Sequence, residues 1–152
     1  HYYIAAFSKQ LLKDVNENFK NYIPYSSKDL KTNKKQIFPL KLLIELWEYG
    51  NANIIESISD FDFCKELNFF HTIPKIKIKD DQVITFCYVI NKLKKTIKDT
   101  KVSEVWENEI LESLNINSNT YKSKKTYLKQ KDSSIDSKAI AKQIDDIFKP
   151  FL

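Results

Sequence analysis

Apolar residues recur at three- and four-residue steps along most of this chain, which is the spacing of one face of an α-helix. The strongest run covers residues 80–97, where further apolar residues extend the surface to neighbouring faces. A helix that is apolar on several sides is normally buried on several sides. We therefore expect it to be the central helix of a bundle, with Asp80 or Asp81 capping its start and lysines near its end. Its main face consists of Val83, Phe86, Cys87, Ile90, Leu93 and Ile97.

Weaker runs predict further helices on both sides of the central one. Pro39 fits the first position of a helix, and Gly50 fits the position just past its end. Ser59 or Asp60 fits the cap of a short helix, and Pro150 fits a stop after the last helix. The expected ranges are residues 2–22, 39–49, 51–58, 60–67, 103–114 and 136–149.

One segment departs from the helical pattern. Isoleucine and lysine alternate over residues 73–78, as in a strand, but Pro74 cannot donate to a sheet ladder. We expect an extended segment across the bundle without a good partner strand, and a polar, mobile connection over residues 128–134. The predicted fold class is all-α, a compact bundle of about six helices with one short extended segment near residues 73–78. Residues 1–152 form a single helical domain in this prediction, and a C-terminal helical subdomain over residues 100–152 is the alternative.

Composition narrows the class of protein. The chain of 152 residues has one glycine, Gly50, and four prolines, whereas phosphate loops, dinucleotide folds and tight hairpins need more glycine. The net charge is +5, and all 25 basic residues are lysines. A basic surface suits a polyanion, although no arginine is present for the commonest bidentate contact with guanine. The composition of an AT-rich genome explains the lysines equally well.

Candidate catalytic and metal-binding residues are few. His71 is the only histidine away from the terminus, and its neighbours Phe69 and Phe70 favour a packing role. The chain contains no HExxH, CxxC or nucleophile-elbow motif, so we expect no enzyme activity, no metal and no cofactor. Cys64 and Cys87 lie in apolar surroundings and are predicted to be buried, free thiols. Free thiols indicate a reducing compartment, so the expected location is cytoplasmic, and no apolar run approaches the length of a membrane helix.

Residues 107–128 contain the most suggestive motif. A predicted helix ends at Leu114, and the next three residues supply a turn residue, an apolar residue and a polar cap: Asn115, Ile116 and Asn117. With the second helix that follows, this order resembles the helix-turn-helix module of DNA-binding proteins, whose second helix contacts base edges. Asparagine tolerates the left-handed conformation that the turn requires. The resemblance implies that the outward, nucleic-acid-binding side chains are Ser118, Asn119, Lys122, Ser123, Lys125 and Thr126.

Two positions depart from the module, and a second interpretation stays open. Leu111 stands where the module has a small residue, and Lys124 stands where it has an apolar one. A plain helical hairpin with a solvated lysine face matches the same residues. Another basic run precedes the motif and is either part of one binding patch or a further solvated face. Its lysines are Lys92, Lys94, Lys95, Lys98 and Lys101.

The sequence therefore leaves two functions open. The first is non-catalytic binding of nucleic acid, expected to be duplex DNA, as part of a regulator or mobile-element protein. A fainter similarity exists to regulators of Bacteroidetes conjugative elements, which place such a module near the C-terminus. The second is a protein–protein interaction module of a larger cytosolic assembly without a nucleic-acid role, because the chain has more large apolar groups than a small bundle buries. These groups are Tyr2, Tyr3, Phe61, Phe63, Phe69, Phe70, Phe151 and Leu152.

Overall fold

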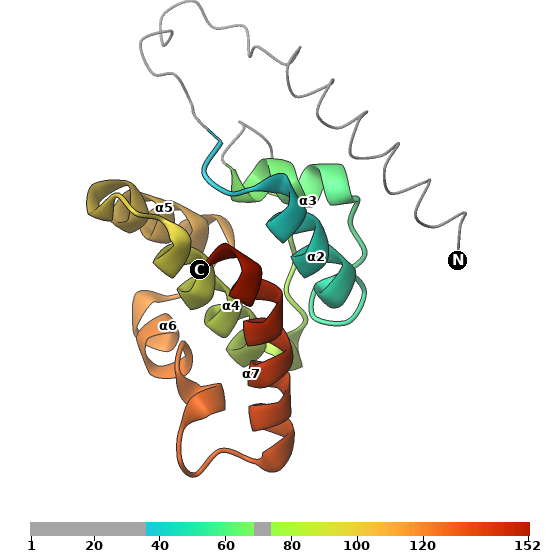
Figure 1. Ribbon diagram of the computed structural model, residues 1–152, viewed down its shortest axis with the longest axis vertical. Coiled ribbons are helices and arrows are strands. Elements are labelled where there is room, and N and C mark those ends of the chain that lie inside the picture. Colours follow the sequence, from blue (N-terminus) through green and yellow to red (C-terminus); the bar gives the residue numbers. More distant parts are fainter. Residues whose placement is uncertain (1–35, 69–73) are drawn as a thin grey trace, which may run out of the picture. The chain divides into compact units, whose positions relative to one another are not determined.

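The computed structural model describes residues 36–68 and 74–152 (Figure 1). Within these residues the chain forms α-helices joined by short turns, and its only β-type pairings are two isolated bridges. The all-α prediction is therefore confirmed. The helices are α2 (Leu40–Gly50), α3 (Asp60–Leu67), α4 (Val83–Thr96), α5 (Thr100–Ser113), α6 (Ser118–Lys124) and α7 (Ile135–Phe148). The 3-10 turns are η1 (Asp80–Gln82), η2 (Tyr127–Lys129) and η3 (Lys149–Phe151).

The described residues from 36 onward cluster as one compact unit. The helix predicted over residues 2–22 lies outside the described residues, as do Phe69, Phe70 and His71. Within the described unit, α5, α6 and α7 all pack against α4. The helices of residues 100–152 therefore share one core with the central helix.

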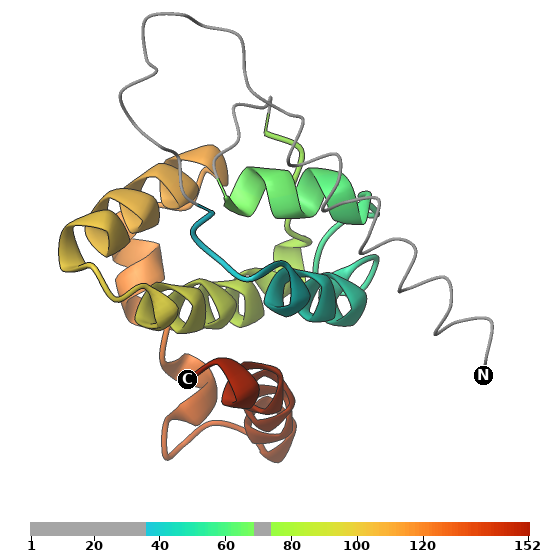
Figure 2. The same cartoon turned by 45° about the horizontal axis from the view of Figure 1, so that its top comes forward.

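Helix α4 is the central helix that its sequence predicts. It contacts α5, α6, α7 and η2, and Figure 2 shows α7 (red) below it, viewed nearly along the axis of α7. Phe86, Cys87 and Ile90 are at most 3% exposed, as expected for a helix with apolar residues on several faces. The predicted caps are wrong, because neither Asp80 nor Asp81 caps α4. Both residues belong to η1, which leads into the helix.

The predicted helix over residues 51–58 is wrong. Ala52 has a left-handed backbone with φ of 61°, and the side-chain oxygen of Asn51 accepts a 2.9 Å hydrogen bond from the Ile58 amide. An asparagine that satisfies nearby backbone in this way competes with helix formation. The preceding helix is shifted by one residue, since α2 begins after Pro39 and includes Gly50 as its last residue.

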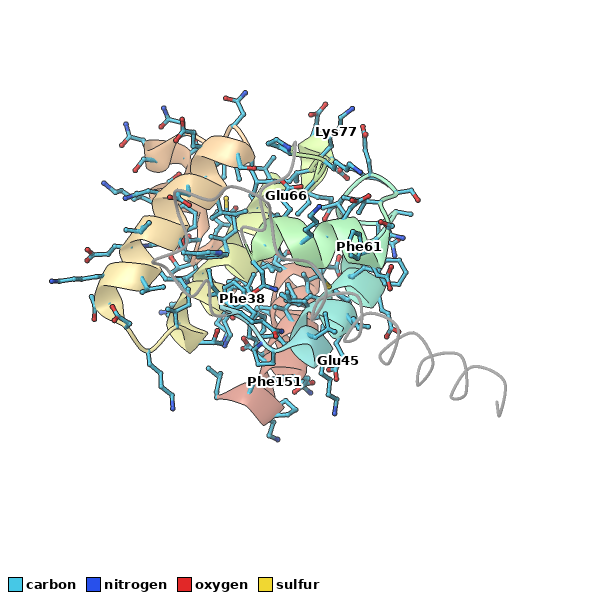
Figure 3. All side chains as sticks on the ribbon, turned by 90° about the horizontal axis from the view of Figure 1, so that it is seen from above. Phe38, Glu45, Phe61, Glu66, Lys77 and Phe151 are labelled. Carbon is cyan, nitrogen blue, oxygen red and sulfur yellow. The ribbon has the colours of Figure 1, made fainter. Side chains whose placement is uncertain are left out.

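The extended segment has a partner, contrary to expectation. Ile78 forms an antiparallel bridge with Ile55, and the Glu56 amide donates to the Lys77 carbonyl at 2.8 Å. The buried carboxylate of Glu66, labelled in Figure 3, accepts hydrogen bonds from the amides of residues 75 and 76 at 2.7 and 2.9 Å. These bonds satisfy the backbone of a segment that no sheet covers.

Two helix starts and one loop differ from the prediction, and side-chain hydrogen bonds explain the difference. Helix α5 begins at Thr100, three residues earlier than predicted, because Asp99 caps it through the amides of residues 101 and 102. Ser134 caps α7 in the same way. The connection over residues 128–134, predicted to be polar and mobile, is partly packed into the core, since Leu128 is 3% exposed and Ser133 is 8% exposed. The Ser133 hydroxyl also donates to the carbonyls of Leu128 and Gln130.

The core contains both thiols, as the sequence predicts. Cys64 and Cys87 are free and buried. Burial raises the pKa of Cys64 to about 12, with a smaller contribution from Asp60, and burial raises the pKa of Cys87 to about 11. Phe38, labelled in Figure 3, is 1% exposed and meets Trp106 edge-on at 5.0 Å between ring centroids. This pair anchors the start of the described unit to α5.

Candidate nucleic-acid interface

A tight turn joins α5 to α6. Asn115 has a left-handed backbone with φ of 54°, which is the conformation predicted for the turn and one that asparagine tolerates. Its amide donates to the Glu112 carbonyl at 3.0 Å, and the Ile116 amide donates to the Leu111 carbonyl at 2.8 Å. These bonds satisfy the last carbonyls of α5 and turn the chain into α6.

Helix α6 is short and firmly held. The side chain of Asn117 caps it by accepting a 2.8 Å hydrogen bond from the Asn119 amide. Tyr121 is 1% exposed and is the one residue of α6 that is buried. Burial raises the pKa of its phenol, and the neighbouring Glu107 carboxylate raises it further. On α4, the Asn91 side-chain amide donates to the carbonyl of Lys125 at 3.3 Å, which fixes the end of α6.

The predicted site residues do not all face solvent. Lys125 is half-buried, and its ammonium lies over the Tyr121 ring at 5.3 Å from the centroid. The Ser123 hydroxyl donates to the carbonyl of Thr120 at 2.9 Å, so it is already bonded within its own helix. The exposed residues are Ser118, Asn119, Lys122, Ser123 and Thr126. The α5–α6 hairpin thus brings these five side chains onto a solvent-facing surface.

Both departures from the helix-turn-helix pattern have a place in the structure. Leu111 is 6% exposed and belongs to the core between α5 and its neighbours. Lys124 is half-buried, and its positive charge acts on the Cys87 thiol of α4. The lysine therefore occupies the inward-facing side of α6 only in part.

Charge is concentrated around α6. No aspartate or glutamate occurs from residue 113 to residue 131, and this stretch carries five lysines. We call residues 118–131 the α6–η2 surface. Within the described residues, Lys122, Lys124 and Lys131 form no ion pair. Their charges are therefore available to an anionic partner.

The basic run of residues 92–101 is arranged differently. Lys92 pairs with Asp145 at 2.8 Å, and its side chain is only 13% exposed. Lys94 pairs with Glu107 at 2.9 Å. These two lysines neutralise carboxylates of the bundle, whereas the other three lysines of the run are exposed and form no ion pair within the described residues. Lys129 also pairs with Asp145.

The net charge of the whole chain overstates the basicity of the described unit. Residues 1–35 have seven lysines against three carboxylates, whereas residues 36–152 have 18 lysines against 17. Most of the overall charge of +5 therefore belongs to the first 35 residues. In the folded unit, the location of unpaired lysines matters more than their total number.

The described residues offer little to a small ligand. They include no group of three or more metal-binding side chains placed to hold an ion. A cavity lined by apolar residues such as Leu46, Ile54 and Phe86 measures about 10 Å³, which is roughly the space for one water. No helix among the described residues has the length and apolarity needed to cross a bilayer.

Tyr127 is a candidate residue that the sequence pattern did not single out. It is the first residue of η2, within the carboxylate-free stretch, and its side chain is 43% exposed. Its exposure follows from the structure and not from the sequence pattern.

Comparisons with known proteins provide no relative from which a function could be transferred. No protein-family model, curated protein or solved structure matches the chain. A function therefore has to come from the chain's own residues and their arrangement.

Proposed function

We propose that this protein binds nucleic acid without catalysis, through the α6–η2 surface. The observation that carries the proposal is the contrast between two sets of lysines. Lys92 and Lys94 on α4 are paired with carboxylates, whereas Lys122, Lys124 and Lys131 have no ion pair within the described residues, and no acidic residue occurs from 113 to 131. Lysines that are unpaired and accessible to solvent attract a phosphate backbone.

Lysine contacts with phosphate supply affinity but do not read sequence. In this proposal, base contacts come from polar side chains at the start of α6. Ser118 and Asn119 lie in its first turn and are exposed, and asparagine can bond adenine in a bidentate manner. Duplex DNA is the proposed target, in keeping with the helix-turn-helix resemblance, and a regulator or mobile-element protein is the proposed setting.

The firm attachment of α6 supports the proposal on energetic grounds. Tyr121 anchors its inner side, Asn117 caps its start and Asn91 holds the carbonyl just beyond its end. A surface whose backbone is already ordered loses less conformational entropy when a ligand binds. The exposed side chains of α6 are therefore presented on a fixed support.

The proposal is tested by the salt dependence of binding to a random DNA duplex, measured by fluorescence anisotropy at about 50 and about 200 mM salt. Replacing Lys122 and Lys131 with alanine should weaken binding and reduce the log–log salt slope by about one to two units. The matched control is the double variant Lys95→Ala with Lys98→Ala, because these two lysines are also exposed and have no ion pair within the described residues. Equal losses in both double variants would indicate diffuse charge attraction instead of a defined surface.

A second function, docking of another protein, is favoured by a different observation. Val102 and Val105 are 43% and 55% exposed on the outer side of α5. Of the surplus apolar groups in the described residues, Phe63 is buried and Leu152 is 71% exposed, while Phe61 and Phe151 are half-buried. This alternative predicts no binding of duplex DNA at moderate salt by the native protein or by either double variant.

A further inference from the structure

We infer that Tyr127 stacks on an unpaired base, so that the α6–η2 surface binds DNA more tightly where bases are unpaired, as at a duplex end, a bulge or an opened strand. This inference rests on the proposed function and adds a preference for unpaired bases to its duplex DNA target. The strongly exposed large apolar side chains of the described residues are Tyr127 and four aliphatic ones: Val102, Val105, Ile135 and Leu152. The exposed aromatic ring is the one that lies within the carboxylate-free, lysine-rich stretch.

The backbone that carries Tyr127 is fixed on its inner side. The next residue, Leu128, is 3% exposed. The Gln130 amide donates to the Tyr127 carbonyl at 3.1 Å, closing the η2 turn. The Ser133 hydroxyl donates to the carbonyls of Leu128 and Gln130 at 3.0 and 2.7 Å. Since tyrosine has only two side-chain torsions, such a ring offers contact area with little loss of conformational entropy.

Lys129, two residues after Tyr127, strengthens the attachment of the η2 turn to the core. Lys129 pairs with Asp145 on α7, and its ammonium lies 5.9 Å from the centroid of the Tyr88 ring on α4. The η2 turn is thereby tied to both helices through one side chain. Tyr127 is thus an exposed ring on a turn that is bonded to the core, whereas an exposed side chain on a loose loop would lose more freedom on binding.

The basic residues close to Tyr127 in sequence suit the phosphates of a single strand. Lys124 and Lys125 precede Tyr127 in sequence by three and two residues, and no carboxylate lies within the stretch. Proteins that bind single strands combine such basic surfaces with aromatic rings on which bases stack. In a duplex each base is already stacked between its neighbours, so its face is available only at an end, a bulge or an unpaired strand. The ring therefore adds affinity for unpaired bases and little for a closed duplex.

The inference is tested with the full chain and three fluorescent probes that contain the same number of phosphates per strand. They are an oligothymidylate of about 12 nucleotides, an abasic strand of equal length and a closed duplex, the length being chosen to match common single-strand site sizes. The native protein should bind the oligothymidylate more tightly than the abasic strand. Tyr127→Ala should weaken oligothymidylate binding by roughly fivefold to a hundredfold and leave abasic-strand binding nearly unchanged.

Tyr127→Phe is the matched variant, because it keeps the ring and should keep the preference for bases. Circular dichroism melting of each variant verifies that it is folded. Equal binding of oligothymidylate and abasic strand by the native protein would overturn the stacking role while leaving lysine–phosphate binding in place. An unchanged preference in Tyr127→Ala would overturn it as well. If the native protein binds none of the probes, the proposed function fails together with this inference.

Discussion

The hydroxyl of Tyr88 on α4 donates a 2.8 Å hydrogen bond to the carboxylate of Asp145 on α7. The same carboxylate pairs with Lys92 on α4 and with Lys129 of η2. One aspartate thus connects the central helix, the last helix and the turn that carries Tyr127. Partly buried, charge-assisted bonds of this kind are stronger than neutral ones, so Asp145 links the stability of the bundle to the position of the α6–η2 surface.

Asp145 should make the stability of the protein depend on pH in the acid range. Burial by itself would raise the pKa of its carboxyl, but hydrogen bonds from Lys129, Lys92 and Tyr88 outweigh this effect and lower the pKa from 3.8 to about 2. Because the pKa is lower in the folded state than in the unfolded state, the stabilisation is complete above about pH 5 and is lost as the pH falls through about 2.

The measurement is urea denaturation of the native protein and of Asp145→Asn between about pH 5 and pH 2. The substitution should lower the free energy of unfolding by about 1–3 kcal/mol near neutral pH. The difference between the two proteins should shrink toward pH 2, since an increasing fraction of the native protein then carries a protonated, neutral carboxyl at this position. A difference that stays constant over this range would show that the carboxylate is not held ionised by its three partners.

Glycine at position 50 should be a site where the protein can be stabilised. Gly50 is the last residue of α2, and its φ is negative, so it does not need the left-handed freedom of glycine. A Cβ atom there would lie 3.8 Å from the Cβ and Cδ1 atoms of Ile54, which is ordinary van der Waals contact. Gly50→Ala should therefore raise the free energy of unfolding by about 0.5–1 kcal/mol, mainly by restricting the unfolded chain. Thermal and urea denaturation would detect the change, and a loss of stability would mean that the space beside Ile54 is smaller than it appears.

The elements that the sequence predicts best are those whose signal is local. The central helix follows from its apolar spacing, and the cap of α3 by Ser59 follows from its position before the helix. The Asn115 turn likewise depends on the residue that occupies it. In each case the residues that determine the conformation are neighbours in sequence.

Features that depend on distant partners were missed or wrong. The role of Lys92 as a partner of Asp145 requires α7 to lie beside α4, and these residues are 53 positions apart. The bridge between Ile55 and Ile78 likewise joins residues that are 23 positions apart. Lysine spacing alone cannot separate charges that are neutralised in the fold from those that remain unpaired. The unpaired lysines around α6 can therefore be identified only from the structure.

The left-handed turn residue Asn115 provides a test of the hairpin that is independent of any ligand. At φ of 54° an alanine is strained by its Cβ, whereas glycine is not. Asn115→Ala should lower the free energy of unfolding by about 1 kcal/mol, and Asn115→Gly should leave it within about 0.5 kcal/mol of the native value. Asn108→Ala is the matched control, because this exposed asparagine lies within α5 and alanine there has the higher helix propensity. The same variants also test the interface: Asn115→Gly should bind nucleic acid like the native protein, since it keeps α6 in place. A similar loss of stability in all three variants would mean that the turn does not depend on the left-handed conformation of residue 115.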